Sequence, residues 1–190
     1  MKKNLIWIVI AVVLVAVIAG ASLLYPRLRE VHGDNNLISA PTSSSANNTH
    51  EPTAPDFTVY DENGNAVKLS DFRSKPVVVN FWTSWCYYCK IEMPDFEKAR
   101  LEYPDVQFLM INATDGYSET IDSAKAFIES TGYGFDVFYD TDRDAVKAYG
   151  VTGYPTTYFI DANGDLVTRS SGAMTYDSLV KAIGLITEND

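Results

Sequence analysis

The sequence predicts an α/β fold in which a central mixed β-sheet is covered by helices on both faces. Three observations lead to this class. About 135 residues, from residue 56 onward, alternate between apolar stretches of strand length and stretches with helical spacing. Two short segments carry the turn chemistry of β-hairpins, and an amphipathic segment follows the second of them. Alternating strands and helices form parallel pairs, whereas hairpins add antiparallel strands, so we expect a mixed sheet.

The first expected elements are a hairpin and a buried strand. Residues 56–60 alternate in polarity like a strand, Glu62-Asn63-Gly64-Asn65 carries a hairpin turn signal, and residues 66–69 return as the second strand. Residues 77–83 form a continuous apolar run, which is typical of a strand buried on both of its faces.

A helix, a strand and a second helix are expected next. Residues 86–103 have helical spacing, with an interruption expected at Pro94 because proline lacks the N–H that a helix needs. Residues 106–112 read as another buried strand. Residues 120–131 place four apolar side chains on one helical face.

The last expected elements are shorter, and the second hairpin signal lies among them at Ala162-Asn163-Gly164-Asp165. They are a strand at residues 135–139, a helix at 142–149, strands at 156–160 and 166–170, and a helix at 176–186.

The N-terminal 25 residues are expected to lie outside the folded domain. Residues 5–25 form a stretch of 21 residues without a charge, about 31 Å long as a helix and sufficient to cross a bilayer. We predict that residues 1–25 are a transmembrane anchor; Ala19-Gly20-Ala21 leaves a cleavable signal peptide as the alternative. Lys2 and Lys3 favour a cytoplasmic N-terminus, so the rest of the chain is expected outside the cytoplasm.

Residues 26–54 read as a flexible extracytoplasmic linker, because their Ser, Thr and Asn-rich part has no hydrophobic period. Residues 55–190 then form one domain, large enough to bury a single core and expected to act as a monomer. The chain's net charge of −10 comes from this domain, because the residues before it carry four basic and three acidic side chains. An acidic domain without a basic stripe argues against nucleic-acid binding.

The chain has only two cysteines, Cys86 and Cys89, at the expected junction between a strand and a helix. The first turn of a helix has free N–H groups and a partial positive charge, and both favour a reactive thiolate. Positions three apart share a helical face, so the pair can close a disulfide. A purely structural disulfide closing so short a loop would contribute little stability. Zinc is disfavoured because His32 and His50 lie in the linker, and we expect no metal or cofactor.

Two segments carry a resemblance to the thioredoxin superfamily, Phe81-Trp82-Thr83-Ser84-Trp85-Cys86-Tyr87-Tyr88-Cys89-Lys90 and Gly153-Tyr154-Pro155-Thr156-Thr157. The sequence Glu92-Met93-Pro94-Asp95-Phe96 narrows the resemblance to the TlpA/ResA-like group of membrane-anchored, extracytoplasmic thiol–disulfide oxidoreductases. The resemblance covers residues 54–185. It implies a thioredoxin-like fold with an N-terminal β-hairpin and an inserted helix near residues 120–131.

The residues around the cysteines are expected to have unequal roles. Cys86, at the helix start, is the predicted nucleophile, and Cys89 resolves the mixed disulfide. The resemblance implies that Glu92 sits behind the pair, where burial would raise its pKa and let it exchange a proton with Cys89. The alternative is a solvated surface glutamate. Asn80 stands where thioredoxins usually have a buried aspartate, so Glu92 is the expected acid.

Five residues are predicted to contact a protein client: Trp85, Tyr87, Tyr88, Tyr154 and Pro155. The resemblance implies that Pro155 is cis and faces the cysteines, while the residue before it offers backbone groups to a client strand. Tyr87-Tyr88 departs from the group, which often has proline in the second position. Trp82 is expected in the core.

These predictions describe an extracytoplasmic reductase of disulfides in exported proteins, such as apocytochrome c during cytochrome c maturation, with a membrane redox partner that re-reduces the cysteine pair. The same residues would serve a disulfide oxidase or isomerase. A thiol peroxidase is a further alternative, because Thr83-Ser84-Trp85-Cys86 matches the Thr-x-x-Cys core of peroxiredoxins, although Val79 replaces their proline. A redox-inert binding module is the last alternative.

Overall fold

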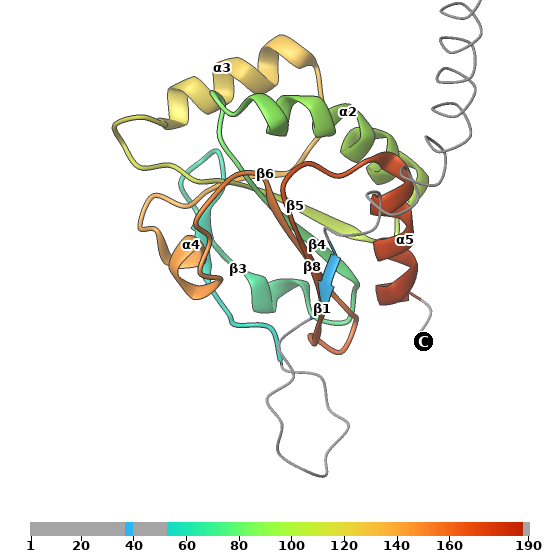
Figure 1. Cartoon of the computed structure of the whole chain (residues 1–190). Helices are drawn as coiled ribbons and strands as arrows, with labels where there is room; N and C mark the ends of the chain where they lie inside the picture. Colours follow the sequence, from blue (N-terminus) through green and yellow to red (C-terminus); the bar gives the residue numbers. More distant parts are fainter. Residues whose placement is uncertain (1–36, 40–52, 188–190) are drawn as a thin grey trace, which may run out of the picture. The chain divides into compact units, whose positions relative to one another are not determined.

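A mixed eight-stranded sheet forms the centre of the structure, with the strand order β1-β8-β7-β4-β5-β6-β2-β3 (Figure 1). This computed structural model describes residues 37–39 and 53–187. Strands β4, β5 and β6 pair in parallel, and the other neighbours pair antiparallel. The predicted mixed sheet is therefore confirmed. The strands are β1 (Leu37–Ser39), β2 (Thr58–Tyr60), β3 (Ala66–Lys68), β4 (Val77–Trp82), β5 (Gln107–Asn112), β6 (Val137–Tyr139), β7 (Thr156–Ile160) and β8 (Leu166–Ser171).

Helices cover both faces of the sheet, as predicted. They are α2 (Tyr87–Glu102), α3 (Ile121–Thr131), α4 (Asp144–Ala148), α5 (Tyr176–Thr187) and the short 3-10 helix η1 (Leu69–Phe72). One apolar core lies beneath α2, α3 and α5, and a second lies on the opposite face beneath α4 and η1. Strand β4 is buried throughout because it supplies both cores: Val78 and Trp82 face the first, and Val79 and Phe81 face the second.

Both predicted hairpin turns are present and share one mechanism. Asp61 and Asp161 each accept hydrogen bonds at Oδ1 from the N–H groups of the residues two and four positions later. Gly64 and Gly164 sit in the left-handed region, at φ of 81° and 88°, where a side chain would be strained. The inserted helix α3 is also delimited locally, by a side-chain cap from Thr120 and by left-handed Gly132.

Three local expectations need correction. Pro94 lies inside α2, which runs unbroken from Tyr87 to Glu102, because the N–H that proline lacks removes only one bond of the helical ladder. Leu69 begins η1 rather than ending a strand, since the Asp71 carboxylate accepts the N–H of Lys68 and starts a tight turn. Residues predicted as linker also form strand β1, which pairs with β8.

The predicted anchor at residues 1–25 lies outside the described residues. Within residues 37–39 and 53–187, no helix combines the length and the apolar character needed to cross a membrane.

A substitution at Phe81 tests how much the second core contributes to stability. Its ring is fully buried and packs against Tyr149 and Tyr158. We expect Phe81→Ala to lower the free energy of unfolding by about 3–5 kcal/mol, because the change leaves a cavity on the central strand. Leu101→Ala, on the exposed surface of α2, should change it by less than about 0.5 kcal/mol. Urea denaturation followed by circular dichroism measures both, and equal effects would contradict this account of the core.

Candidate active site

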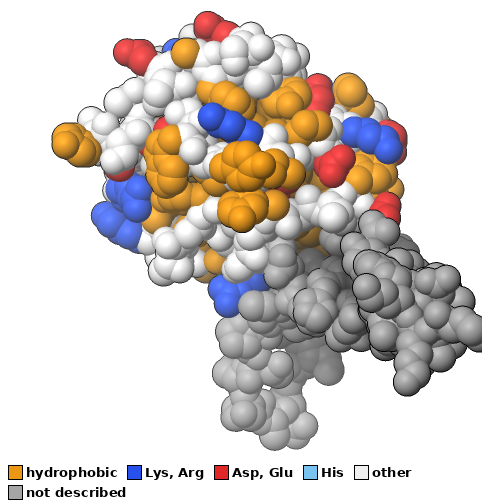
Figure 2. Space-filling model, turned by 45° about the horizontal axis from the view of Figure 1, so that its top comes forward, with side chains coloured by type: hydrophobic (Ala, Val, Ile, Leu, Met, Phe, Trp, Pro, Cys, Tyr) orange, Lys and Arg blue, Asp and Glu red, His pale blue; other side chains and the backbone are white. Residues whose placement is uncertain are grey.

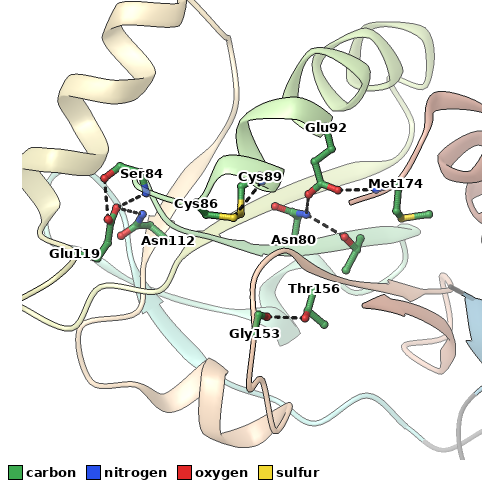
Figure 3. Close-up of a disulfide and its surroundings, with 11 residues drawn as sticks. Asn80, Ser84, Cys86, Cys89, Glu92, Asn112, Glu119, Gly153, Thr156 and Met174 are labelled. Atoms are coloured by element: carbon green, nitrogen blue, oxygen red, sulfur yellow. Dashed lines mark hydrogen bonds between the residues drawn. A yellow bond between two sulfur atoms is a disulfide. The ribbon is translucent and has the colours of Figure 1, made fainter. Parts of the chain in front are cut away.

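Cys86 and Cys89 form a disulfide at the start of α2, directly after the carboxyl end of β4 (Figure 3). Cys86 is the N-cap residue, and its Sγ accepts a hydrogen bond of 3.1 Å from the N–H of Cys89. The sulfur of Cys86 is thus placed against the free N–H groups of the first turn, which favour a thiolate there after reduction. Cys86 is 5% exposed and Cys89 is fully buried, so Cys86 is the more accessible of the two, as predicted.

Glu92 lies one helical turn after Cys89 and points into the protein toward β4. It is 1% exposed, so the alternative of a solvated surface glutamate is wrong. Its Oε1 accepts a 2.8 Å hydrogen bond from Nδ2 of Asn80, and its Oε2 accepts a 2.9 Å bond from the N–H of Met174. Asn80 Nδ2 also donates to Oγ1 of Thr157 at 2.9 Å. The carboxyl group therefore joins α2, β4 and the segment before α5.

Burial raises the pKa of Glu92 to about 8, because desolvation penalises the charged form. The hydrogen bonds from Met174 and Asn80 oppose this rise, and the nearby charge of Asp95 adds to it. With the cysteines as a disulfide, Glu92 is mostly a neutral acid at neutral pH. A carboxyl that titrates near pH 8 is suited to exchanging protons with a thiol, whose ordinary pKa is close to 8.5.

Of the five residues predicted to contact a client, three lie exposed on the surface, whereas Tyr154 is partly buried and Pro155 is buried. Trp85, Tyr87 and Tyr88 are 57%, 70% and 62% exposed. Figure 2 shows hydrophobic side chains gathered on the side of the molecule that carries α2 and α3. The Trp85 ring packs edge-on against Tyr154 at 6.1 Å, and the rings of Tyr87 and Tyr88 pack edge-on at 5.5 Å. Trp82 is fully buried, as predicted.

The Tyr154–Pro155 peptide bond is cis, as predicted, and lies immediately before β7. Within the part of the chain that the structure describes, the N–H and C=O of Tyr154 make no hydrogen bond. The contact with Trp85 places this free backbone beside the loop that carries Cys86. An extended segment can pair with such groups.

A second buried carboxyl, that of Glu119, was missed by the sequence analysis. Its Oε1 accepts hydrogen bonds from the Ser84 N–H at 2.9 Å and from Asn112 Nδ2 at 2.7 Å, and its Oε2 accepts one from Ser84 Oγ at 2.7 Å. Glu119 thus fixes the loop that leads into Cys86, on the side of the disulfide opposite Glu92 (Figure 3). Its place in a polar loop gave no pattern from which burial follows.

The fold and the disulfide at a helix start define a thioredoxin-like redox protein, and comparisons with known proteins narrow this class. The sequence model of the AhpC/TSA family matches residues 51–169. Thiol-disulfide oxidoreductase ResA of Bacillus subtilis (strain 168) is 34% identical over 133 residues, which cover 70% of this chain and 73% of that protein. ResA of Geobacillus kaustophilus (strain HTA426) is 36% identical over 129 residues, covering 67% and 72%.

A solved structure of a thioredoxin-like protein is also similar to this chain. The pneumococcal exposed lipoprotein thioredoxin Etrx1 of Streptococcus pneumoniae strain TIGR4 has a TM-score of 0.60 at 30% identity, covering 67% of this chain and 97% of that one. The chain therefore belongs to the AhpC/TSA family and, within it, to the ResA-like thiol–disulfide oxidoreductases.

The raised pKa of Glu92 predicts a pH-dependent stability. Between pH 4.5, its ordinary pKa, and about 8, the folded chain holds a proton that the unfolded chain has released. The free energy of unfolding should therefore fall as the pH rises through this window, by up to about 1.4 kcal/mol per pH unit. Glu92→Gln lacks this component. Urea denaturation of both disulfide-bonded chains from pH 5 to 9 should show the variant gaining relative stability up to about pH 8; parallel profiles would contradict a buried, titrating Glu92.

Proposed function

We propose that this chain is a membrane-anchored, extracytoplasmic disulfide reductase that acts as a monomer on exported client proteins, with apocytochrome c in cytochrome c maturation as the leading client. The observation that carries the proposal is the disulfide at the start of α2 backed by the buried acid Glu92. The relation to ResA supports it. The uncharged stretch at residues 5–25 supports the anchor, and Lys2 and Lys3 before it support a domain outside the cytoplasm.

The reaction is a two-step exchange. In the reduced enzyme, the Cys86 thiolate attacks one sulfur of a client disulfide, forming a mixed disulfide and releasing the other client sulfur as a thiolate. Cys89 then attacks Cys86, which re-forms the 86–89 disulfide and releases the second client thiol. Two electrons pass from the enzyme to the client. A separate membrane redox partner must return two electrons, because the exported side lacks the cytoplasmic reductant pools.

Glu92 supplies the proton chemistry of the second step. Cys89 is buried and attacks as a thiolate, so its proton must leave it. The ionised fraction of Glu92, one helical turn away, accepts this proton and becomes a neutral acid. The raised pKa of Glu92 in the disulfide form agrees with this end state. On re-reduction, the same carboxyl returns the proton to Cys89.

Clients are held by the surface around Cys86. The free N–H and C=O of Tyr154 pair with an extended client segment, and Trp85 and the Tyr87-Tyr88 pair contact its side chains. The peroxidase alternative has less support. It rests on Thr83, whose buried hydroxyl has no hydrogen-bond partner among the described residues, while Cys86 Sγ accepts its bond from Cys89.

The direction of electron flow is tested by the reduction potential. A reductase requires that the 86–89 disulfide be a weaker oxidant than client disulfides, so we expect an equilibrium potential well below −120 mV, the region typical of strong oxidants. Equilibration with glutathione or dithiothreitol buffers, read by thiol alkylation and mass, measures this quantity. A potential near or above about −120 mV would instead favour the alternative function, that of a disulfide oxidase.

Removing the resolving thiol should trap clients. In Cys89→Ala the first step proceeds but the second cannot, so mixed disulfides through Cys86 should accumulate and be seen on non-reducing gels. They should appear in the membrane fraction, because the anchor remains attached. The double variant Cys86→Ala, Cys89→Ala is the matched control and should trap nothing. The reductase proposal fails if Cys89→Ala traps no exported protein, and trapped species in the soluble fraction alone would argue against the anchor.

A further inference from the structure

Exposed hydrophobic side chains are concentrated in two segments, the one that carries the disulfide and the one that leads into α3. Among the described residues, six of the eight large hydrophobic side chains with high exposure belong to the start of α2, the loop before it, the loop before α3, or the first residue of α3. These six are Trp85, Tyr87, Tyr88, Ile91, Tyr117 and Ile121. The first three were predicted client contacts. Tyr117 was not, and at 93% it is the most exposed of the set.

Tyr117 sits at the tip of a loop that is closed by its own hydrogen bonds. Oδ1 of Asp115 accepts the N–H groups of Tyr117, Ser118 and Glu119 at 2.7–2.9 Å. The N–H groups of Asp115 and Gly116 both donate to the carbonyl oxygen of Glu119 at 3.0 Å. This closed backbone holds the aromatic ring out in solvent, where it adds nothing to either core.

The same loop is attached to the active-site loop. The Glu119 carboxyl accepts the N–H and Oγ–H of Ser84, two residues before Cys86 (Figure 3). The Cα atoms of Tyr117 and Glu119 are at most about 7 Å apart, because a chain advances no more than that over two residue positions. The backbone of the loop that carries Tyr117 is therefore tied to the loop that carries the nucleophile.

The strand order of the sheet sets the direction in which a bound segment would cross this surface. Tyr154 precedes β7 and the Tyr117 loop follows β5, and these strands flank β4 on opposite sides. A segment that pairs with Tyr154 and runs across the ends of β7, β4 and β5 covers about 10 Å from first to last strand. Extended chain spans that distance in roughly three residues.

We propose that the loop at residues 115–119 is a client-recognition element, in which Tyr117 contacts an aromatic or apolar side chain of an extended client segment, roughly two to four residues from the reacting cysteine. This rests on the proposed function and extends its client surface to the β5 side. Its occupant is an unfolded segment, because one extended strand reaches Tyr154, Cys86 and Tyr117 in turn. Aromatic side chains on a preformed loop are suited to such a contact, since little ordering is needed on binding.

The test uses the full chain in its reduced form and short peptides that carry one cysteine as a mixed disulfide with a chromogenic thiol. Two peptide pairs place Phe or Ser four residues before or after this cysteine. For the better Phe peptide, Tyr117→Ser should lower the second-order rate constant about fivefold to thirtyfold, as expected for loss of an aromatic anchor. The Phe-to-Ser preference of the native chain should shrink by the same factor. Leu101→Ser, which removes an exposed hydrophobic side chain from the C-terminal end of α2, should keep that preference.

A small aromatic disulfide serves as the internal reference for the chemistry of Cys86. The proposal is overturned if Tyr117→Ser slows this reagent and both peptides equally, because the loop would then act on the cysteines themselves. It is also overturned if the native chain shows no preference for Phe over Ser in the peptides. This holds even if adding Tyr117→Ser to Cys89→Ala reduces the trapping of a folded partner, because the proposed occupant is an unfolded segment. A native chain that reacts with the small disulfide but with no peptide would overturn the proposed function as well.

Discussion

One buried carboxyl group constrains the whole redox centre. The oxygens of Glu92 accept hydrogen bonds from Asn80 on β4 and from the N–H of Met174 before α5, so a single side chain joins the cysteine helix to the sheet and to the segment that leads into the C-terminal helix. Where α2 packs on the sheet, water is excluded from the Glu92 carboxyl group. The same exclusion of water raises the pKa of Glu92. Packing and proton chemistry therefore have the same cause. A change that admits water would loosen α2 and return the pKa toward its ordinary value together.

The sheet topology brings the other parts of the site to the same edge. Strands β4 and β5 are parallel, so the loops after both emerge at their carboxyl ends, and β7 runs antiparallel and begins at that edge. The first loop carries Cys86, the second carries Glu119, and the segment before β7 carries Tyr154 and cis Pro155. Bonds between Glu119 and Ser84 then fix the first two loops to each other. No single segment could build this site alone.

Sequence alone predicted what depends on local pattern. Apolar periodicity located the strands and helices, and the turn residues located both hairpins, because these signals act within a few positions along the chain. The burial of Glu92 and the cis bond before Pro155 came from family resemblance rather than from pattern. The Ser84–Glu119 and Asn80–Thr157 contacts were not predicted. They join residues 35 and 77 positions apart, and such pairings exist only after β4 has its neighbours in the sheet.

The two buried carboxyls divide the work of the site. Glu92 lies behind the disulfide, where it is desolvated and titrates, whereas Glu119 lies on the other side and binds the backbone and hydroxyl of Ser84. In the proposed reaction, the first exchanges protons with the cysteine pair, and the second fixes the position from which Cys86 would meet a client. The exposed aromatic side chains Trp85, Tyr87, Tyr88 and Tyr117 contribute nothing to the buried core. If clients bind as proposed, their choice can change through Tyr87, Tyr88 and Tyr117 while the buried groups keep the same exchange chemistry.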